Sequence, residues 1–123
     1  MRLNDKEILV ELNDKTFHCA MDVSMSFMGG KWKTVVLWYL RKETLRFGQL
    51  RKLCPQITER MLSITLKQLE EDGLVSRKVY TKKPPLKVEY SLTEFGRSTI
   101  PMLEEIAKWG RMVSKSRGKL IEK

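Results

Sequence analysis

Hydrophobic side chains recur every three to four residues over most of this chain, the spacing of helices that bury one face. The segment 31–41 is the most apolar and is expected to form the centre of the core. Gly29, Pro55 and Gly73 mark helix ends, because glycine favours helix C-termini and proline restricts the residue before it. The pattern predicts helices at about 3–12, 20–28, 31–41, 47–54 and 58–72.

Two later segments alternate with a period of two, which indicates strands. These are 75–80 and 86–92, and the stretch "TKKPP" between them cannot continue a strand ladder because proline lacks the amide donor. The pattern therefore predicts a hairpin with a basic, proline-stiffened tip. After it, Thr93 should cap a long last helix that Pro101 kinks or interrupts.

The order of these elements predicts the fold class. A helix, a short helix, a tight turn, a further helix and a hairpin make a winged helix-turn-helix, in which the second helix of the pair enters the major groove of DNA. We expect an α+β fold, mostly helical with a β-hairpin wing. Residues 1–123 should form a single domain, with 31–92 as the helix-turn-helix and wing.

The charge distribution agrees with a DNA partner. The chain holds 24 Lys and Arg against 15 Asp and Glu, a net charge of +9. The excess lies in 31–60 and 76–91, whereas 1–15 is slightly acidic. Concentrated positive charge indicates a polyanion partner, although a basic surface that serves only solubility is an alternative on charge alone.

The helix expected at 58–72 has an outer face suited to DNA if its leucines face the core. Arg60 can bind guanine in a bidentate manner, Ser63 can reach a base edge or a phosphate, and Lys67 a phosphate. Thr58 and the free amides beside it favour a phosphate oxygen. Glu59 either accepts from a cytosine amino group or complements the helix dipole. The DNA-contact residues predicted here are Thr58, Glu59, Arg60, Ser63, Ile64 and Lys67, with Lys82, Lys83 and Lys87 on the wing.

Six blocks of the sequence carry a further signal: "GGKW" (29–32), "RFGQLRK" (46–52), "ITERML" (57–62), "LEEDGLVSRKVY" (69–80), "PPLKVEYSLTEFGRS" (84–98) and "WG" (109–110). In this order they resemble the HxlR family of bacterial transcriptional regulators, within the wider MarR-like winged-helix proteins. The resemblance covers about 17–113 and implies a homodimeric DNA-binding regulator. It also implies dimerisation helices within 3–28 and 94–115, and makes Arg46 a phosphate anchor.

The resemblance directs attention to Cys19, because members of the family commonly carry a cysteine at the start of the corresponding helix, and several sense oxidants or electrophiles through it. Ala20 replaces the proline that often follows. A helix N-terminus beside Lys15 and His18 favours the reactive thiolate, although an inert thiol is the alternative. Cys54 has no such counterpart and is expected to fill the core.

Apolar positions on the terminal helices favour a homodimer. Exposed on a monomer, those of the last helix would leave a large apolar patch. The methionines of the helix at 20–28 could line an effector pocket, but packing in the core or the dimer is the more common role. The dimerisation residues predicted here are Met21, Met25, Leu103, Ile106, Trp109 and Val113.

Other functions find little support in the sequence. A single histidine and two distant cysteines have no metal-ligand spacing, and no catalytic constellation or cofactor motif is present, so neither a metal, a cofactor nor an enzyme is expected. No run could span a membrane, and the charged N-terminal stretch does not resemble a secretory signal. Two cysteines suit a reducing cytoplasm.

The function expected is a sequence-specific, dimeric regulator of transcription that binds double-stranded DNA at an inverted repeat. A repressor is favoured because the chain is compact and has no activation module. The alternatives are a non-specific nucleic-acid binder and a winged-helix protein-interaction module. The operator, the regulated genes and any small-molecule effector are left open.

Overall fold

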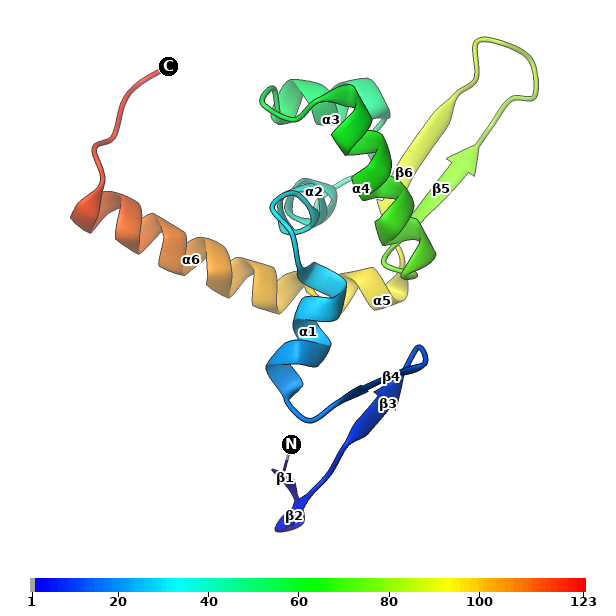
Figure 1. Cartoon of the computed structure of the whole chain (residues 1–123). Helices are drawn as coiled ribbons and strands as arrows, with labels where there is room; N and C mark the ends of the chain where they lie inside the picture. The colour runs from blue at the N-terminus through cyan, green and yellow to red at the C-terminus, as the bar shows by residue number, and fades with distance from the viewer. Residues whose placement is uncertain (1) are drawn as a thin grey trace.

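The computed structural model describes residues 2–123, apart from the side chain of Leu3. Figure 1 shows α2 at the centre, with α3, α4 and the β5–β6 hairpin on one side and α1, α5 and α6 on the other. The helices are α1 (Ala20–Met28), α2 (Lys33–Leu40), α3 (Phe47–Leu53), α4 (Glu59–Glu71), α5 (Glu94–Arg97) and α6 (Ile100–Arg117). The strands are β1 (Arg2–Leu3), β2 (Lys6–Glu7), β3 (Val10–Leu12), β4 (Lys15–Phe17), β5 (Val75–Val79) and β6 (Val88–Leu92).

The core forms around α2, as its apolar sequence predicts. Val36 and Leu37 are fully buried, and α2 contacts α3, α4, α6 and β6. The leucines of α4 complete this core from the other side, because Leu62, Leu66 and Leu69 are all buried. Their spacing of three to four residues places them on one face of α4, so the opposite face is free to contact a partner.

Both ends of α4 are fixed by local hydrogen bonds. Thr58 caps its start, because its hydroxyl accepts from the Met61 amide at 3.0 Å. At the other end Gly73 has a φ of +79°, a left-handed conformation that favours glycine. This turn lets the Leu74 amide donate to the Leu69 carbonyl at 2.9 Å. The helix therefore begins and ends where the sequence predicts.

The predicted wing is an antiparallel pair of strands joined by the proline-containing tip. Val75 pairs with Leu92 at its base, and Val79 pairs with Val88 toward the tip. A third segment joins the hairpin at Leu45, whose amide donates to the Tyr90 carbonyl at 2.9 Å, while the Tyr90 amide donates back at 2.8 Å. This bridge attaches the start of α3 to the wing.

The expected helix at 3–12 is wrong, because this stretch forms two short hairpins, β1–β2 and β3–β4. Their two-residue turns are Asn4-Asp5 and Asn13-Asp14, and all four of these residues have positive φ values between 52° and 63°. Asparagine and aspartate tolerate this conformation, which a two-residue hairpin turn requires. The only helix within the expected N-terminal dimerisation segment 3–28 is therefore α1.

The last helix is interrupted, as Pro101 predicts. Thr93 caps the short α5, its hydroxyl accepting from the Gly96 amide at 2.9 Å. A turn at 98–99 then interrupts the helix before α6. Pro101 lies in the first turn of α6, where its missing amide hydrogen is tolerated. Among the described helices, none has the length and hydropathy needed to cross a membrane.

Candidate nucleic-acid interface

The outer face of α4 carries the side chains predicted to read DNA. Arg60, Ser63 and Lys67 are exposed, and Ile64 is 38% exposed beside them. The buried residues of α4 all lie on the other face. The predicted division of this helix into a core face and an outer face is therefore confirmed.

Glu59 has a partner that the sequence did not indicate. Its Oε1 lies 3.0 Å from Nη1 of Arg51, which belongs to α3. Nη2 of Arg51 also donates to the Ile57 carbonyl at 3.3 Å, in the turn between the two helices. Arg51 thus connects α3 to the start of α4 and neutralises the one acidic side chain in the first turn of α4.

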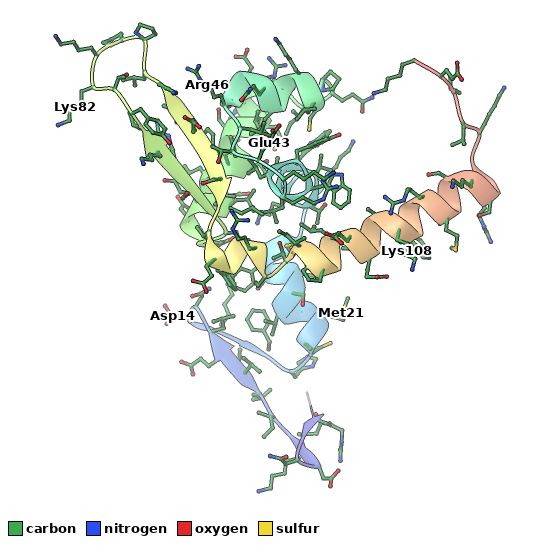
Figure 2. The ribbon with its side chains drawn as sticks, turned by 180° about the vertical axis from the view of Figure 1, so that it is seen from behind. Asp14, Met21, Glu43, Arg46, Lys82 and Lys108 are labelled. Carbon is green, nitrogen blue, oxygen red and sulfur yellow. The ribbon has the colours of Figure 1, made fainter. Side chains whose placement is uncertain are left out.

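The three lysines predicted on the wing differ in their surroundings. Lys82 and Lys83 lie at the exposed tip, and Figure 2 shows Lys82 at the outer end of the wing, far from Asp14 on the N-terminal hairpins. Lys87, nearer the strands, lies 3.7 Å from a carboxylate oxygen of Glu89. The tip lysines are therefore the more available for a phosphate.

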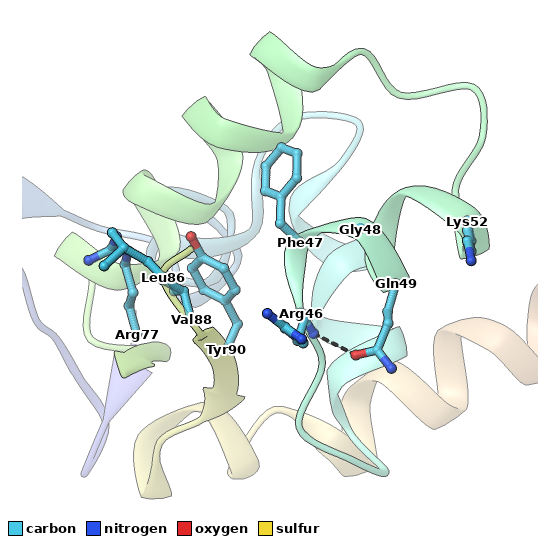
Figure 3. A pocket seen from close by; sticks show the side chains of 9 residues that line it. All are labelled: Arg46, Phe47, Gly48, Gln49, Lys52, Arg77, Leu86, Val88 and Tyr90. Atoms are coloured by element: carbon cyan, nitrogen blue, oxygen red, sulfur yellow. Dashed lines mark hydrogen bonds between the residues drawn. The ribbon is translucent and has the colours of Figure 1, made fainter. Parts of the chain in front are cut away.

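A groove of about 600 Å³ separates α3 from the wing (Figure 3). Arg46, the residue after the Leu45 bridge, lines this groove. Its backbone amide donates to Oε1 of Gln49 at 2.8 Å. In the view of Figure 3 the Tyr90 ring lies between the side chains of Arg46 and Arg77. The groove is lined by Arg46, Phe47, Gly48, Gln49, Lys52, Arg77, Leu86, Val88 and Tyr90.

A second hollow, of about 310 Å³, connects this groove to α4. Its lining includes Ser63 and Lys67 of α4, and it shares Phe47, Arg77 and Tyr90 with the groove. The outer face of α4, the α3–wing groove and the wing thus form one continuous surface. Sequence reasoning missed Arg77 and Tyr90, although pairing the predicted strands in register would have placed them opposite one another.

The two cysteines are both free and differ in exposure. Cys19 precedes α1, is partly exposed, and its carbonyl accepts from the Val23 amide at 3.2 Å. Cys54 ends α3 and is only 5% exposed, and this burial raises the pKa of its thiol. The expectation that Cys54 fills the core is confirmed.

Most of the residues predicted for dimerisation are exposed apolar side chains. Met21 on α1 and Trp109 on α6 are 65% and 66% exposed, and Met25 and Ile106 are also exposed. Leu103 differs, because it is only 3% exposed and packs in the core. The expectation of an exposed Leu103 is therefore wrong: this residue lies on the stripe of α6 that faces α2.

The fold and this surface define a class of protein. A helix-turn-helix whose second helix is buried on one face and polar on the other, with a β-hairpin wing beside it, is the architecture of winged-helix DNA-binding proteins. The chain matches the HxlR-like helix-turn-helix family over residues 27–117. It belongs to this family, and it is a helix-turn-helix transcriptional regulator.

Relatives of known sequence support this assignment. An HTH-type transcriptional regulator of Methanothermobacter thermautotrophicus is 44% identical over 102 residues, covering 83% of this chain and 77% of that protein. The HTH-type transcriptional regulator YkvN of Bacillus subtilis is 48% identical over 96 residues, covering 78% and 80%.

Solved structures extend the likeness to a redox regulator and to a protein with a bound quinone. The reduced form of the redox regulator HypR matches with a TM-score of 0.73 at 41% identity, covering 77% of this chain and 93% of that one. Quinone-bound YodB of Bacillus subtilis matches with a TM-score of 0.62 at 27% identity, covering 75% and 96%.

Proposed function

We propose that this protein is a homodimeric, sequence-specific repressor that acts in the cytoplasm on an inverted-repeat operator. The observation that carries the proposal is the exposed polar face of α4, flanked by the basic wing on one continuous surface. Arg60 reads a guanine in the major groove, and Ser63 reaches a base edge or a phosphate. Lys67, Arg46 and the wing lysines Lys82, Lys83 and Lys87 contact phosphates, together with Thr58 at the helix N-terminus.

The homodimer uses the apolar surfaces of α1 and α6. Met21, Met25, Ile106 and Trp109 are large apolar side chains exposed on the monomer, and Val113 lies beside them on α6. A second copy that covers them would bury this surface and place the two α4 helices about 34–36 Å apart, or a multiple of this spacing. Sedimentation of the wild type and of Trp109→Glu tests this step, and a monomeric wild type would contradict it.

Cys19 is proposed to make the repressor responsive to oxidants or electrophiles. Its thiol is partly exposed at the start of α1, beside the apolar dimer surface. The relationship to HypR, a redox regulator, and to YodB, which was solved with a bound quinone, supports this proposal. Modification of Cys19 would change operator affinity through the position of α1.

The decisive experiment is selection of binding sites from random duplex DNA at physiological salt, followed by titration of the selected duplex against a scrambled one. An enriched inverted repeat that binds at least about a thousandfold more tightly than the scrambled duplex supports a specific dimeric regulator. Equal binding of both duplexes would make the protein a general nucleic-acid binder and would reject the proposal.

The same titration tests the role of Cys19. Diamide or a quinone should change the operator affinity of the wild type and leave that of Cys19→Ser unchanged. Cys54→Ser is the matched control, because Cys54 is buried and should leave the response intact. A response that persists in Cys19→Ser would contradict this part of the proposal.

A further inference from the structure

We propose that the groove between α3 and the wing holds a backbone phosphate of the bound DNA, with Arg77 and the Tyr90 hydroxyl as donors opposite Arg46. This inference rests on the proposed function, which supplies the DNA. It adds two residues, one from each strand of the wing, to the contact surface. It also assigns the groove to DNA rather than to a free anionic ligand.

Strand pairing positions two of the three side chains. Arg77 and Tyr90 are direct partners in the β5–β6 register, so they project from the same face of the hairpin. Two hydrogen bonds join Leu45 to Tyr90, and Arg46, the next residue, lines the same groove on the other side of the Tyr90 ring from Arg77 (Figure 3). The positions of Arg77 and Tyr90 therefore follow from strand pairing and not from the conformation of the wing tip.

The groove carries positive charge without a compensating acid on its walls. Its lining includes Arg46, Lys52 and Arg77 and no acidic residue. Within the described residues 2–123, none of these three cations has an ion-pair partner. Such a group favours an anion, and the planar guanidinium suits the oxygens of a phosphate.

The position of the groove relative to α4 selects DNA as the source of the phosphate. Arg77 and Tyr90 also line the second hollow, together with Ser63 and Lys67 of α4. With α4 in the major groove of DNA, a DNA strand that leaves α4 toward the wing passes over this hollow and enters the groove between α3 and the wing. Glu70 lines that hollow but not the groove itself, so phosphate contact is favoured in the groove.

The test is the salt dependence of binding to the selected operator and to the scrambled duplex, from about 50 to 200 mM salt. Each phosphate contact contributes about 0.9 to the slope of log affinity against log salt concentration. The Arg77→Gln dimer loses two phosphate contacts, so the magnitude of its slope should fall by about 1.8. The factor by which its affinity drops between about 50 and 200 mM salt should then be about 12-fold smaller than for the wild type. Arg77→Lys should keep the slope.

Two further variants separate the loss of a charged contact from other effects on binding. Tyr90→Phe should weaken binding to both duplexes by about fivefold per protomer without changing the slope, because it removes a neutral donor. Lys6→Gln removes the same charge as Arg77→Gln from the N-terminal hairpins, at the end of the molecule away from α4, and should change the slope little (Figure 1). Inorganic pyrophosphate, titrated into the DNA-free protein, tests for a free anion.

The outcomes separate this inference from the proposed function. An equal effect of Arg77→Gln on both duplexes, with their affinity ratio unchanged, supports a phosphate contact. An unchanged slope overturns it, and so does a loss confined to particular bases. Pyrophosphate binding that needs Arg77, with an unchanged slope on DNA, would assign the groove to a free anion instead. A wild type that does not distinguish operator from scrambled duplex would instead reject the proposed function.

Discussion

Replacing Arg51 by methionine should weaken operator binding through Glu59. In the protein Arg51 bonds the Glu59 carboxylate at 3.0 Å and the Ile57 carbonyl at 3.3 Å. Methionine keeps much of the aliphatic packing but leaves Glu59 without its partner at the start of α4. The free carboxylate would then face the phosphates that the helix N-terminus attracts.

The effect on folding should be small and the effect on binding larger. The side chain of Glu59 is 75% exposed, and an exposed ion pair contributes about 0.2–1 kcal/mol. The loss of the bond to Ile57 is partly offset, because Nε of Arg51 is buried without an acceptor and its desolvation cost disappears. Two unit charges 4 Å apart in water interact by about 1 kcal/mol. Release of Glu59 should therefore cost about 0.5–1 kcal/mol per protomer.

A double-mutant cycle isolates this term from the general loss of positive charge. Operator affinity, measured by fluorescence anisotropy, is compared for the wild type, Arg51→Met, Glu59→Gln and the double variant. Arg51→Met should weaken a dimer's binding about 5- to 30-fold more with Glu59 present than with glutamine there. Equal effects in the two backgrounds would refute the reasoning, since Arg51 would then act only through its own charge.

Three further predictions concern stability, base reading and thiol reactivity. Gly96→Ala should lower the free energy of unfolding by about 3 kcal/mol, measured by urea denaturation, because the added Cβ would lie 2.0 Å from a backbone oxygen. In the control Gly48→Ala the added Cβ meets no other atom, so this variant should be neutral or slightly stabilising. Arg60→Ala should cost about 1–3 kcal/mol at one base-pair position and relax its specificity there, as measured by repeated site selection; a uniform loss would mark a phosphate contact instead. Iodoacetamide should modify Cys19 before Cys54 in the folded protein, because burial shields Cys54 and raises the pKa of its thiol, and mass spectrometry should find equal modification of both in urea.

The helix-turn-helix and the wing could be predicted because their sequence signals agree with one another. The leucines of α4 repeat at helical spacing, Thr58 caps its start and Gly73 ends it. The wing strands alternate and flank a tip that cannot continue a ladder. Local preference and burial pattern lead to the same structure here, so the residues on the outer face of α4 follow from the period alone.

The N-terminal hairpins could not be predicted from hydrophobic spacing, because a few apolar residues fit a helical period by chance. The better signal is the sequence "LNDK", which occurs at 3–6 and again at 12–15. Each copy places Asn-Asp at the two turn positions that need positive φ. Turn chemistry outweighed an apparent helical period in this segment.

Residues whose role depends on tertiary contact were harder to place. Leu103 and Ile106 are three residues apart on α6 and equally apolar, but one is buried against the core and the other is exposed. Two adjacent apolar stripes make one wide face, and sequence alone does not show which stripe meets α2. Arg51 was missed for a similar reason, because its partners lie across a turn whose geometry the sequence does not give.

The signal proposed for Cys19 would have to reach α4, and the fold provides a continuous series of contacts between them. Cys19 begins α1, and Phe27 of α1 packs edge-to-face on Phe95 of α5, with ring centroids 5.4 Å apart. Thr93 caps α5, and its hydroxyl also donates to the Gly73 carbonyl at 2.5 Å, immediately after α4. A shift of α1 would therefore move α5 and, through it, the end of α4, without any contact between α1 and the DNA. The interrupted last helix makes this arrangement possible, because the short α5 can lie against both α1 and the end of α4 while α6 extends away as the proposed dimer surface.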